Sequence, residues 1–355
     1  MNWTAADHEF MARALQLAAR GLNTTTPNPR VGCVLVRNGA VVGEGWHERA
    51  GEAHAEVHAL RIAGDAARGA TAYVTLEPCS HHGRTPPCAD ALIDAGVGRV
   101  VAALRDPNPL VAGEGLARLE LAGIEVASGL LENEARELNI GFVSRMTRGR
   151  PWLRLKVAAS IDGKTALNNG QSQWITGPEA RRDAHAWRAR SCAILTGIGT
   201  IRDDDPSLTV RDVPCERQPL RVVVDSRLET PPTAKVLTGG NVLVFAAMAG
   251  TLPGAEVVAL PNADGKVDLA AMLAELGRRG LNEVLTEAGT KLNGSLLKEA
   301  LVDELLIYQA PLLLGDAARG MFGLPELTAL AGATRLEVMD RRVVGADFRI
   351  RARPA

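Results

Sequence analysis

The chain has 355 residues, a length that suggests two domains of about 150 residues each. Hydrophobic residues make up 46% of it and charged residues 23%, which is typical of a folded protein rather than a disordered one. The formal net charge is -1 and aromatic residues make up only 3%, which argues against binding to nucleic acid or to anionic lipid. The sequence has no run of about 18 apolar residues that would span a bilayer, and its polar N-terminus does not resemble a signal peptide.

The five cysteines are an odd number in a long chain, unlike the disulfide framework of a small secreted protein. We therefore expect reduced thiols and a cytoplasmic location, and we interpret cysteines that accompany histidines first as metal ligands or catalytic groups. A lone cysteine is usually a small buried hydrophobe, which is our interpretation of Cys33, Cys192 and Cys215.

The first half of the chain alternates between helical and extended patterns. Thr4 and Asp7 resemble a capping box, and Asn38-Gly39 is a strong hairpin signal. This alternation predicts a layered α/β domain. In chain order, the pattern predicts a helix at 5–20, strands at 31–36 and 40–43, a helix at 54–64, a strand at 71–76, a helix at 87–95, a strand at 99–104, a helix at 115–122, a strand at 124–127 and a helix at 131–138.

Residues 144–151 are basic, contain Gly and Pro, and interrupt the periodic pattern, so we interpret them as a linker. The expected domains are residues 1–147 and residues 151–355. The second half repeats the α/β rhythm, with strands predicted near 153–158, 193–197, 221–225, 242–247, 283–287 and 304–309 and helices near 178–190, 268–279 and 292–299.

The residues that decide the function lie between positions 54 and 88. His54, Cys79 and Cys88 offer one nitrogen and two sulfur ligands, which suits a catalytic Zn²⁺ with its fourth corner left to water. Zinc lowers the pKa of bound water towards neutrality, so that hydroxide becomes available. Glu56 would then carry a proton from that water to the substrate. This is the arrangement of zinc-dependent deaminases, in which the glutamate is not a ligand.

The spacing of the two cysteines departs from the general deaminase signature. Eight residues separate Cys79 from Cys88, where that signature has two. We expect the insert to loop out and Pro86-Pro87 to start a helix, which brings Cys88 to the first turn, where the helix dipole favours a thiolate. The alternatives are a structural zinc site with His81 or His82 as fourth ligand, or no metal. His58 is interpreted as a structural residue of the helix.

Three stretches of the first half resemble the bifunctional deaminase–reductase family of bacterial riboflavin biosynthesis. They are TPNPRVGCV (26–34), GEGWHERAGEAHAEVHAL (43–60) and TLEPCSHHGRTPPCADALI (75–93). The eight-residue insert is that family's own form of the zinc signature. The resemblance implies a cytidine-deaminase-like α/β/α domain that removes the ring amine of 2,5-diamino-6-ribosylamino-4(3H)-pyrimidinone 5′-phosphate. Positions that match the substrate side are Asn28, His47, His81 and Arg84; Arg84 can bind a phosphate bidentately, whereas Asn28 alone would also suit a turn between two prolines.

The residues of the second half are less informative by themselves. They contain neither a G-x-G-x-x-G motif after a strand nor a phosphate-binding P-loop. Gly197 and Gly199 are most simply a tight strand-to-helix turn. The stretch 287–296 would suit a phosphate at a helix N-terminus, but many strand-to-helix turns look the same. The residues alone therefore indicate an α/β domain with weak signs of nucleotide binding.

Four stretches of this half resemble the reductase domain of the same family, namely LKVAASIDGKTA (155–166), SQWITGPEARRD (172–183), TGIGTIRDDDPSLTVR (196–211) and EAGTKLNGSLL (287–297). The resemblance implies a dihydrofolate-reductase-like fold, NADPH as cofactor and hydride transfer to C1′ of the ribosyl group. Positions that match the cofactor side are Ala158, Trp174, Thr200, Asp204, Ser226, Gly289, Thr290, Lys291, Leu292, Asn293, Gly294 and Ser295. Positions that match the substrate side are Lys156, Ser172, Arg188, Leu208, Arg211 and Glu287. Without the resemblance, Arg188 and Arg211 would be ordinary surface arginines.

The leading hypothesis is a cytoplasmic, homo-oligomeric enzyme that deaminates and then reduces one phosphorylated pyrimidine, using Zn²⁺ and NADPH. A second hypothesis keeps the deaminase but takes the C-terminal half as degenerate, or assigns the first site to another nucleobase. A third is a zinc-stabilised scaffolding protein. Glu56 argues against the third, because a structural zinc site does not need a carboxylate that is not a ligand.

Overall fold

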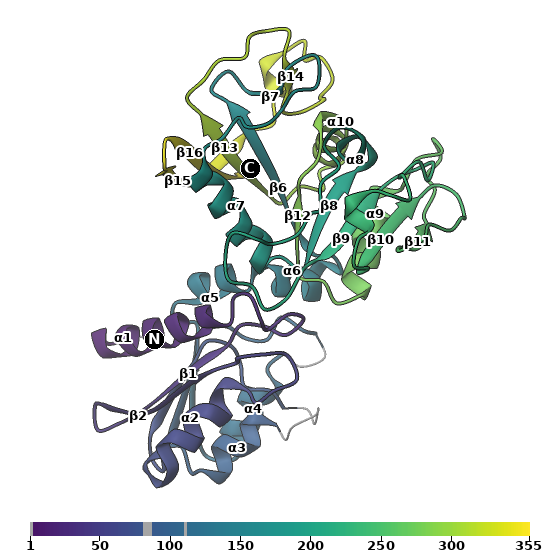
Figure 1. Cartoon of the computed structure of the whole chain (residues 1–355). Coiled ribbons are helices and arrows are strands. Elements are labelled where there is room, and N and C mark those ends of the chain that lie inside the picture. Colours follow the sequence, from purple (N-terminus) through teal and green to yellow (C-terminus); the bar gives the residue numbers. More distant parts are fainter. Residues whose placement is uncertain (1–2, 81–86, 110–111) are drawn as a thin grey trace. The chain divides into compact units, whose positions relative to one another are not determined.

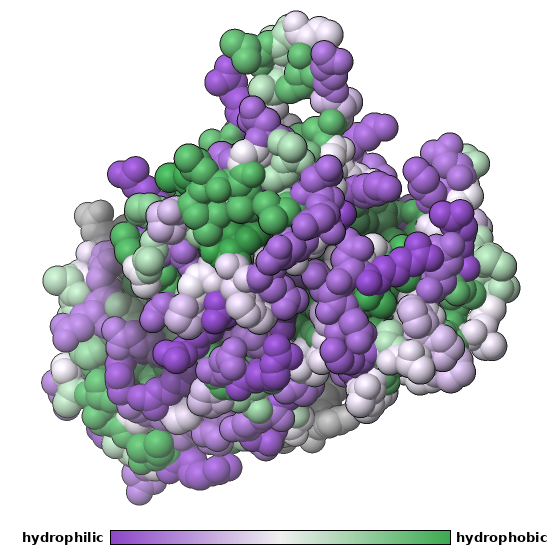
Figure 2. Space-filling model, turned by 45° about the horizontal axis from the view of Figure 1, so that its top comes forward, coloured by the Kyte–Doolittle hydropathy of each residue, from purple (hydrophilic) through white to green (hydrophobic). Residues whose placement is uncertain are grey.

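The computed structural model describes residues 3–80, 87–109 and 112–355 (Figure 1). These residues fall into two compact units, Met1–Gly149 and Arg150–Ala355. Within the described ranges, no helix combines the length and apolar content needed to cross a bilayer. Apolar side chains gather in patches between polar areas on the face of the molecule that Figure 2 presents.

A five-stranded sheet with the order β2-β1-β3-β4-β5 forms the centre of the first unit. β3, β4 and β5 are parallel, and β1 runs antiparallel to both β2 and β3. α1 and α5 lie on one side of the sheet, and α2, α3 and α4 lie on the other (Figure 1). The elements are α1 (Ala5–Arg20), β1 (Gly32–Arg37), β2 (Ala40–Trp46), α2 (Ala55–Ala63), a 3-10 turn (Gly64–Ala67), β3 (Thr71–Val74), α3 (Cys88–Asp94), β4 (Arg99–Ala102), α4 (Glu114–Leu121), β5 (Glu125–Ser128), α5 (Glu132–Leu138) and α6 (Ile140–Arg148).

Local sequence signals explain how two of these helices are placed. The predicted capping box is present at the start of α1, where the Thr4 hydroxyl accepts from Asp7 N–H and the Asp7 carboxylate accepts from Thr4 N–H. α2 packs directly on β2, because a Cβ at Gly43 would lie 2.3 Å from Ala59 O and one at Gly45 would lie 2.5 Å from His58 Cβ. Only glycine permits that approach, and it sets the position of the first turn of α2.

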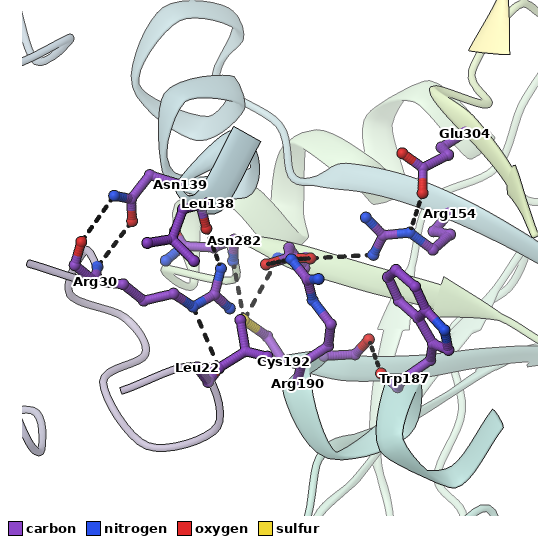
Figure 3. A network of polar contacts seen from close by, with 12 residues as sticks. Leu22, Arg30, Leu138, Asn139, Arg154, Trp187, Arg190, Cys192, Asn282 and Glu304 are labelled. Atoms are coloured by element: carbon purple, nitrogen blue, oxygen red, sulfur yellow. Dashed lines mark hydrogen bonds and ion pairs between the residues drawn. The ribbon is translucent and has the colours of Figure 1, made fainter. Parts of the chain in front are cut away.

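The predicted linker at 144–151 is wrong over most of its length. α6 continues to Arg148, and Gly149 ends it in the left-handed conformation with φ of 69°. Phe142 and Val143 are buried in the core of the first unit, so they hold the helix against the sheet. Just before α6, the Asn139 amide exchanges two hydrogen bonds of 2.8 Å with the Arg30 main chain (Figure 3). Two of the basic residues that suggested a linker, Arg145 and Arg148, lie in the last turn of the helix, where the helix dipole favours them.

The second unit is built on a nine-stranded sheet with the order β11-β10-β9-β8-β12-β6-β13-β16-β15. It is parallel from β11 to β13, and β16 and β15 extend it in antiparallel fashion. β7 and β14 form a separate two-stranded sheet. The elements are β6 (Trp152–Ser160), β7 (Lys164–Ala166), α7 (Pro178–Arg190), β8 (Ala193–Gly197), α8 (Ile198–Asp204), β9 (Leu220–Val224), β10 (Val242–Ala246), β11 (Glu256–Ala259), α9 (Leu269–Arg278), β12 (Glu283–Thr286), α10 (Thr290–Lys298), β13 (Glu304–Ala310), β14 (Arg319–Gly320), β15 (Leu336–Val344) and β16 (Asp347–Pro354), with 3-10 turns at Lys235–Leu237 and Leu330–Gly332.

Several strands and one helix of the second unit were not predicted from the sequence. The strands β15 and β16 are rich in arginine and carry few buried residues, so their pattern does not alternate clearly. β7, β11 and β14 are four residues or fewer, and α8 is a helix of seven. Short or exposed elements of this kind are specified by their neighbours in the fold more than by local periodicity.

A buried charge network supports the middle of the large sheet. The Arg154 side chain is 1% exposed, donates to Glu304 at 2.7 Å and to Glu283 at 3.0 Å, and lies 4.5 Å from the Trp187 ring centroid (Figure 3). Both glutamates are fully buried. Removing one partner of a buried ion pair leaves charge without compensation, which costs more than an exposed pair is worth.

Replacing Arg154 with methionine is therefore expected to lower the free energy of unfolding of this unit by about 3 kcal/mol or more. The control is Arg202→Met, which removes an exposed pair with Glu229 in the same unit and should cost about 1 kcal/mol or less. Urea unfolding curves measure both. Equal costs for the two variants would show that the buried network does not stabilise the sheet.

Candidate functional site

Three ligand side chains converge at one end of the sheet in the first unit. His54 precedes α2, Cys79 lies in the loop that follows β3, and Cys88 is the first residue of α3. Their ligand atoms all lie within 4.8 Å of one another. His54 Nδ1 is 3.2 Å from Cys88 Sγ and 3.6 Å from Cys79 Sγ. Ligands about 2.0–2.3 Å from a tetrahedral ion are separated by such distances, so this set fits Zn²⁺ with one corner open to water.

The long spacing between the cysteines is accommodated by the start of α3. Pro87 caps that helix, so Cys88 stands in its first turn, as the sequence analysis predicted. The main-chain N–H of Cys88 donates to Cys79 Sγ at 3.3 Å, and that of Ala89 donates to Cys79 O at 3.2 Å. A hydrogen bond from the Cys88 thiol, opposed by burial and aided by His54, lowers the pKa of Cys79 to about 4. The same hydrogen bond and burial raise the pKa of Cys88.

Glu56 lies beside the three ligands in the first turn of α2. It is 3% exposed, and among the described residues its Oε2 has no hydrogen-bond partner. Burial raises the pKa of Glu56 to about 7, although the charge of His54 opposes the shift. A buried carboxylate oxygen without a partner costs free energy unless a ligand completes it. The group is therefore suited to exchange a proton with a bound substrate.

Asn28 and His47 form a second layer next to His54. Asn28 Nδ2 lies 3.1 Å from His47 Nε2, and His47 Nδ1 lies 3.1 Å from Ala53 O. The His47 ring is 2% exposed and meets the His54 ring edge-on, with centroids 5.3 Å apart. Since the Asn28 amide donates to Nε2, the imidazole carries its proton on Nδ1. The other two predicted substrate residues, His81 and Arg84, lie outside the described residues, as does the alternative ligand His82.

Glu77 supports the site but was not singled out from the sequence. Its carboxylate accepts main-chain N–H groups from four residues of the segment that leads into α4, namely Asp106, Gly113, Gly115 and Leu116, at 2.9–3.3 Å. A Cβ at Gly115 would lie 1.9 Å from Pro78 O, so the two segments are in close contact. These bonds fix the turn that carries Cys79. The only sequence signal was a glutamate two residues before a ligand. Its partners follow it in the chain by 29 to 39 residues, and only the fold brings them close to it.

The remaining cysteines were predicted to be buried hydrophobes. This is correct for Cys33 and Cys192, which are 0% and 3% exposed. It is wrong for Cys215, which is half-buried and whose thiol donates to Arg217 O at 2.6 Å.

Charged residues predicted to bind the reductase substrate meet in the second unit. Arg188 of α7 donates from Nε and Nη2 to Glu287 at 2.6 and 2.9 Å, and Lys156 Nζ of β6 lies 3.6 Å from Glu287 Oε2. Burial alone would raise the pKa of Glu287, but Arg188 and Lys156 outweigh it and hold that pKa below its usual range. Leu208 is buried with φ of 51°, and Arg211 is exposed beyond it. The cluster combines two cations, Lys156 and Arg188, with the carboxylate of Glu287, which directly follows β12.

The predicted cofactor residues mostly follow the carboxyl ends of parallel strands. Thr200 and Asp204 belong to α8 after β8, Ser226 follows β9, and the run 289–295 follows β12. Such an edge is where open α/β sheets bind ligands. The predicted turn at Gly197 joins β8 directly to α8.

Individual contacts link some of these residues and not others. Ser172 Oγ donates to Asp204 Oδ1 at 3.0 Å, and a Cβ at Gly289 would lie 3.8 Å from Thr200 Oγ1. Trp174 is 69% exposed and stacks under Arg181. Ser226 instead accepts a hydrogen bond from Val267 N–H at 3.1 Å. Ala158 lies on β6 opposite Tyr308 of β13.

The run Gly289–Ser295 forms the start of α10. Thr290, Lys291 and Leu292 make up its first turn after the N-cap Gly289. Asn293 is 1% exposed and donates to Ala288 O at 3.0 Å and to Met321 O at 3.3 Å. Gly294 packs against the main chain of Gly323, where a Cβ would lie 2.3 Å from the carbonyl oxygen. Ser295 is exposed.

Comparison with known proteins identifies two families in the chain. The model of the cytidine and deoxycytidylate deaminase zinc-binding region matches residues 4–104, and the model of the RibD C-terminal domain matches residues 151–350. The riboflavin biosynthesis protein RibD of Escherichia coli K12 is 51% identical, over 96% of this chain and 97% of that protein. The protein of the same name from Haemophilus influenzae is 48% identical, over 100% and 99%.

Solved structures match both units together. RibD of Acinetobacter baumannii is 45% identical, with a TM-score of 0.93 and 99% of each chain covered. A Thermotoga maritima protein described as a diaminohydroxyphosphoribosylaminopyrimidine deaminase/5-amino-6-(5-phosphoribosylamino)uracil reductase is 35% identical, with a TM-score of 0.89 and the same coverage.

Replacing Cys88 with serine is expected to lower the bound zinc to about a tenth or less, because a soft thiolate ligand is lost. The control is Cys192→Ser, a buried cysteine of the second unit that should leave the zinc content unchanged. Metal content per chain is measured by atomic emission after dialysis. Full zinc occupancy in Cys88→Ser would show that Cys88 is not a ligand.

Proposed function

This chain belongs to the RibD family of bifunctional riboflavin biosynthesis proteins, and on that premise we propose the substrate, the order of the two steps and the residues that perform them. A cytidine-deaminase-like α/β domain and a dihydrofolate-reductase-like α/β domain supply the deaminase and reductase activities. The proposed substrate is 2,5-diamino-6-ribosylamino-4(3H)-pyrimidinone 5′-phosphate. Deamination at residues 1–147 comes first, and reduction of the ribosyl group to a ribityl chain at residues 151–355 follows.

One observation carries the deaminase proposal: a buried carboxylate oxygen of Glu56, which has no hydrogen-bond partner among the described residues, lies beside the ligands His54, Cys79 and Cys88. Zinc held by these ligands supplies an activated water nucleophile at neutral pH. Glu56 would accept one proton of the attacking water at its carboxylate and deliver it to the ring nitrogen next to the amine-bearing carbon. It would then take the second proton, from the hydroxyl newly bonded to that carbon, and deliver it to the amine, which leaves as ammonia while the carbonyl forms. A purely structural zinc site would not need this glutamate.

Asn28 and His47 are proposed to orient the pyrimidine. His47 accepts from the Asn28 amide and donates to Ala53 O, which leaves Asn28 Oδ1 as the acceptor turned to the substrate. His81 and Arg84 are proposed to bind the remainder of the substrate, with Arg84 on its phosphate.

Replacing Glu56 with glutamine is expected to reduce ammonia release about 10²–10⁴-fold, because the amide cannot accept the proton. Zinc content and NADPH-dependent reduction of supplied deaminated substrate should not change. The matched control is Glu52→Gln, an exposed glutamate just before α2, which should deaminate normally. Ammonia release at the normal rate by Glu56→Gln would contradict the mechanism.

The reductase proposal rests on the charge cluster and the strand edge beside it. NADPH supplies the hydride that reduces C1′ of the ribosyl group. Lys156, Arg188 and Arg211 are cations suited to the phosphorylated substrate, and Glu287 holds Lys156 and Arg188 in place. Ser172, Leu208 and Glu287 itself complete the proposed substrate side. The proposed cofactor side is the set Ala158, Trp174, Thr200, Asp204, Ser226 and Gly289–Ser295, in which the N-terminus of α10 suits a phosphate of NADPH.

We propose a cytoplasmic location, because zinc ligation by Cys79 and Cys88 requires reduced thiols. The partners proposed are small molecules, with neither nucleic acid nor membrane, since the net charge of -1 provides no global attraction to polyanions.

We also propose a homo-oligomer in which a second copy covers β15. β15 lies at the end of the nine-stranded sheet, where Val338 and Val343 are 58% and 67% exposed. An exposed apolar edge strand has unpaired main-chain N–H and C=O groups that can pair with a strand of another chain. Glu337 precedes Arg341 and Arg342 along the strand, so an antiparallel second copy would place acidic residues near basic ones on a two-fold axis.

Replacing Val343 with aspartate is expected to convert the oligomer to monomers, because a charge would replace an exposed apolar side chain that the second copy would cover. The control is Leu121→Asp, on α4, where the leucine is 91% exposed but stands outside β15 and β16. Light scattering after size-exclusion chromatography gives the mass. A wild-type monomer, or an unchanged oligomer in Val343→Asp, would rule out this surface.

A further inference from the structure

His185 of α7 is a buried histidine to which the proposed reaction assigns no role. It is 7% exposed, and its ring is engaged on both sides. The Arg211 main-chain N–H donates to Nδ1 at 3.2 Å, and Nε2 lies 3.3 Å from Asp212 Oδ2. Since Nδ1 accepts, the proton resides on Nε2 and is donated to the Asp212 carboxylate. One neutral imidazole thus bridges two consecutive residues.

Residues 209–212, which His185 contacts, are held in place by hydrogen bonds from side chains and not by pairing with a β-strand. Arg188 Nη1 donates to Thr209 O at 2.9 Å. The Gln218 side chain makes two hydrogen bonds to the main chain of Val210. Its Oε1 accepts from the Val210 N–H at 2.8 Å, and its Nε2 donates to the Val210 carbonyl at 3.1 Å. Three consecutive main-chain units, 209, 210 and 211, therefore each depend on a side-chain hydrogen bond. Loss of one such bond leaves a main-chain group unpaired and the segment free to move.

The contact between His185 and Asp212 also leaves the Arg211 guanidinium available to bind an anion. Among the described residues, that guanidinium donates to Thr209 Oγ1 at 3.1 Å and has no carboxylate partner. The carboxylate next to it in the chain belongs to Asp212, which His185 binds instead. Burial and the charge of Arg188 lower the pKa of His185 to about 4, so the ring is neutral near pH 7, as its acceptor role requires.

We infer that His185 is a positioning residue of the reductase half, which holds the 209–212 main chain so that Arg211 meets the phosphate of the substrate. His185 does not itself touch the substrate. The inference rests on the proposed function, in which Arg188 and Arg211 bind that phosphate. α7 thereby contributes both a phosphate-binding arginine and, one turn before it, the residue that orients the second arginine.

The test compares two replacements of His185 in the full-length protein. His185→Asn keeps an acceptor near the position of Nδ1 for the Arg211 N–H. His185→Gln reaches the position of Nε2 and can donate to Asp212, but leaves the Arg211 N–H unpaired. Arg182→Gln, at an exposed position of the same helix, is the control. Amide hydrogen exchange of residues 209–212 and steady-state kinetics of NADPH-dependent reduction are measured for each.

His185→Gln is expected to accelerate exchange at residues 209–212 about fivefold, since a lost hydrogen bond is worth about 1 kcal/mol. The KM for the deaminated substrate should rise about tenfold, with kcat within about threefold and the KM for NADPH unchanged. His185→Asn should restore both readouts. Combined with Arg211→Gln, His185→Gln should raise KM no further than Arg211→Gln alone, because the histidine acts through that arginine.

Unchanged exchange in His185→Gln would overturn the inference, because the segment would not depend on the histidine. A fall in kcat without a rise in KM, or a KM effect that adds to that of Arg211→Gln, would also overturn it. Failure of the proposed function is distinguishable, since the wild-type protein would then reduce no deaminated substrate. That result overturns the substrate role of His185, while the exchange data still report on its contact with the main chain.

Discussion

The zinc site depends on two helix N-termini that meet one loop. α2 begins directly after His54, and α3 begins with Cys88 and turns its main-chain N–H groups toward Cys79. The N–H group that Cys88 contributes at the start of α3 helps to lower the pKa of Cys79, so Cys79 is stabilised as the thiolate that binds metal. Small residues set this geometry, because Gly43 and Gly45 let α2 lie on β2. Glu56 is buried as a consequence of the same packing.

The second unit places its charged residues by a related constraint. Parallel strands end at one edge, so the residues after β8, β9 and β12 gather there although they are far apart in sequence. Arg188 and Lys156 hold Glu287 ionised, and the proposed role of His185 adds a neutral group that orients the neighbouring segment. The main chain of residues 209–211, which lies outside the sheet, is fixed by polar side chains.

The sequence predicted what short spacings encode. The α/β class, the capping box at Thr4 and the zinc ligands His54, Cys79 and Cys88 were correct, because each follows from neighbouring residues or a compact motif. Most reductase residues came from resemblance, since no local pattern distinguishes them. The boundary between the two units, after Gly149, lies within the predicted linker 144–151, but most of that stretch is helical, because charge was weighed above the buried face of α6. Glu77 and His185 were missed because their partners are brought to them only by the fold.

The most direct test of the account supplies the purified protein with the diamino-pyrimidinone phosphate, with and without NADPH, and identifies the products by mass spectrometry. The account predicts the deaminated product alone without NADPH, and the deaminated product with a ribityl chain when NADPH is present. Absence of deamination under both conditions, or a reduced product that still carries the ring amine, would contradict the proposed order and division of the two steps.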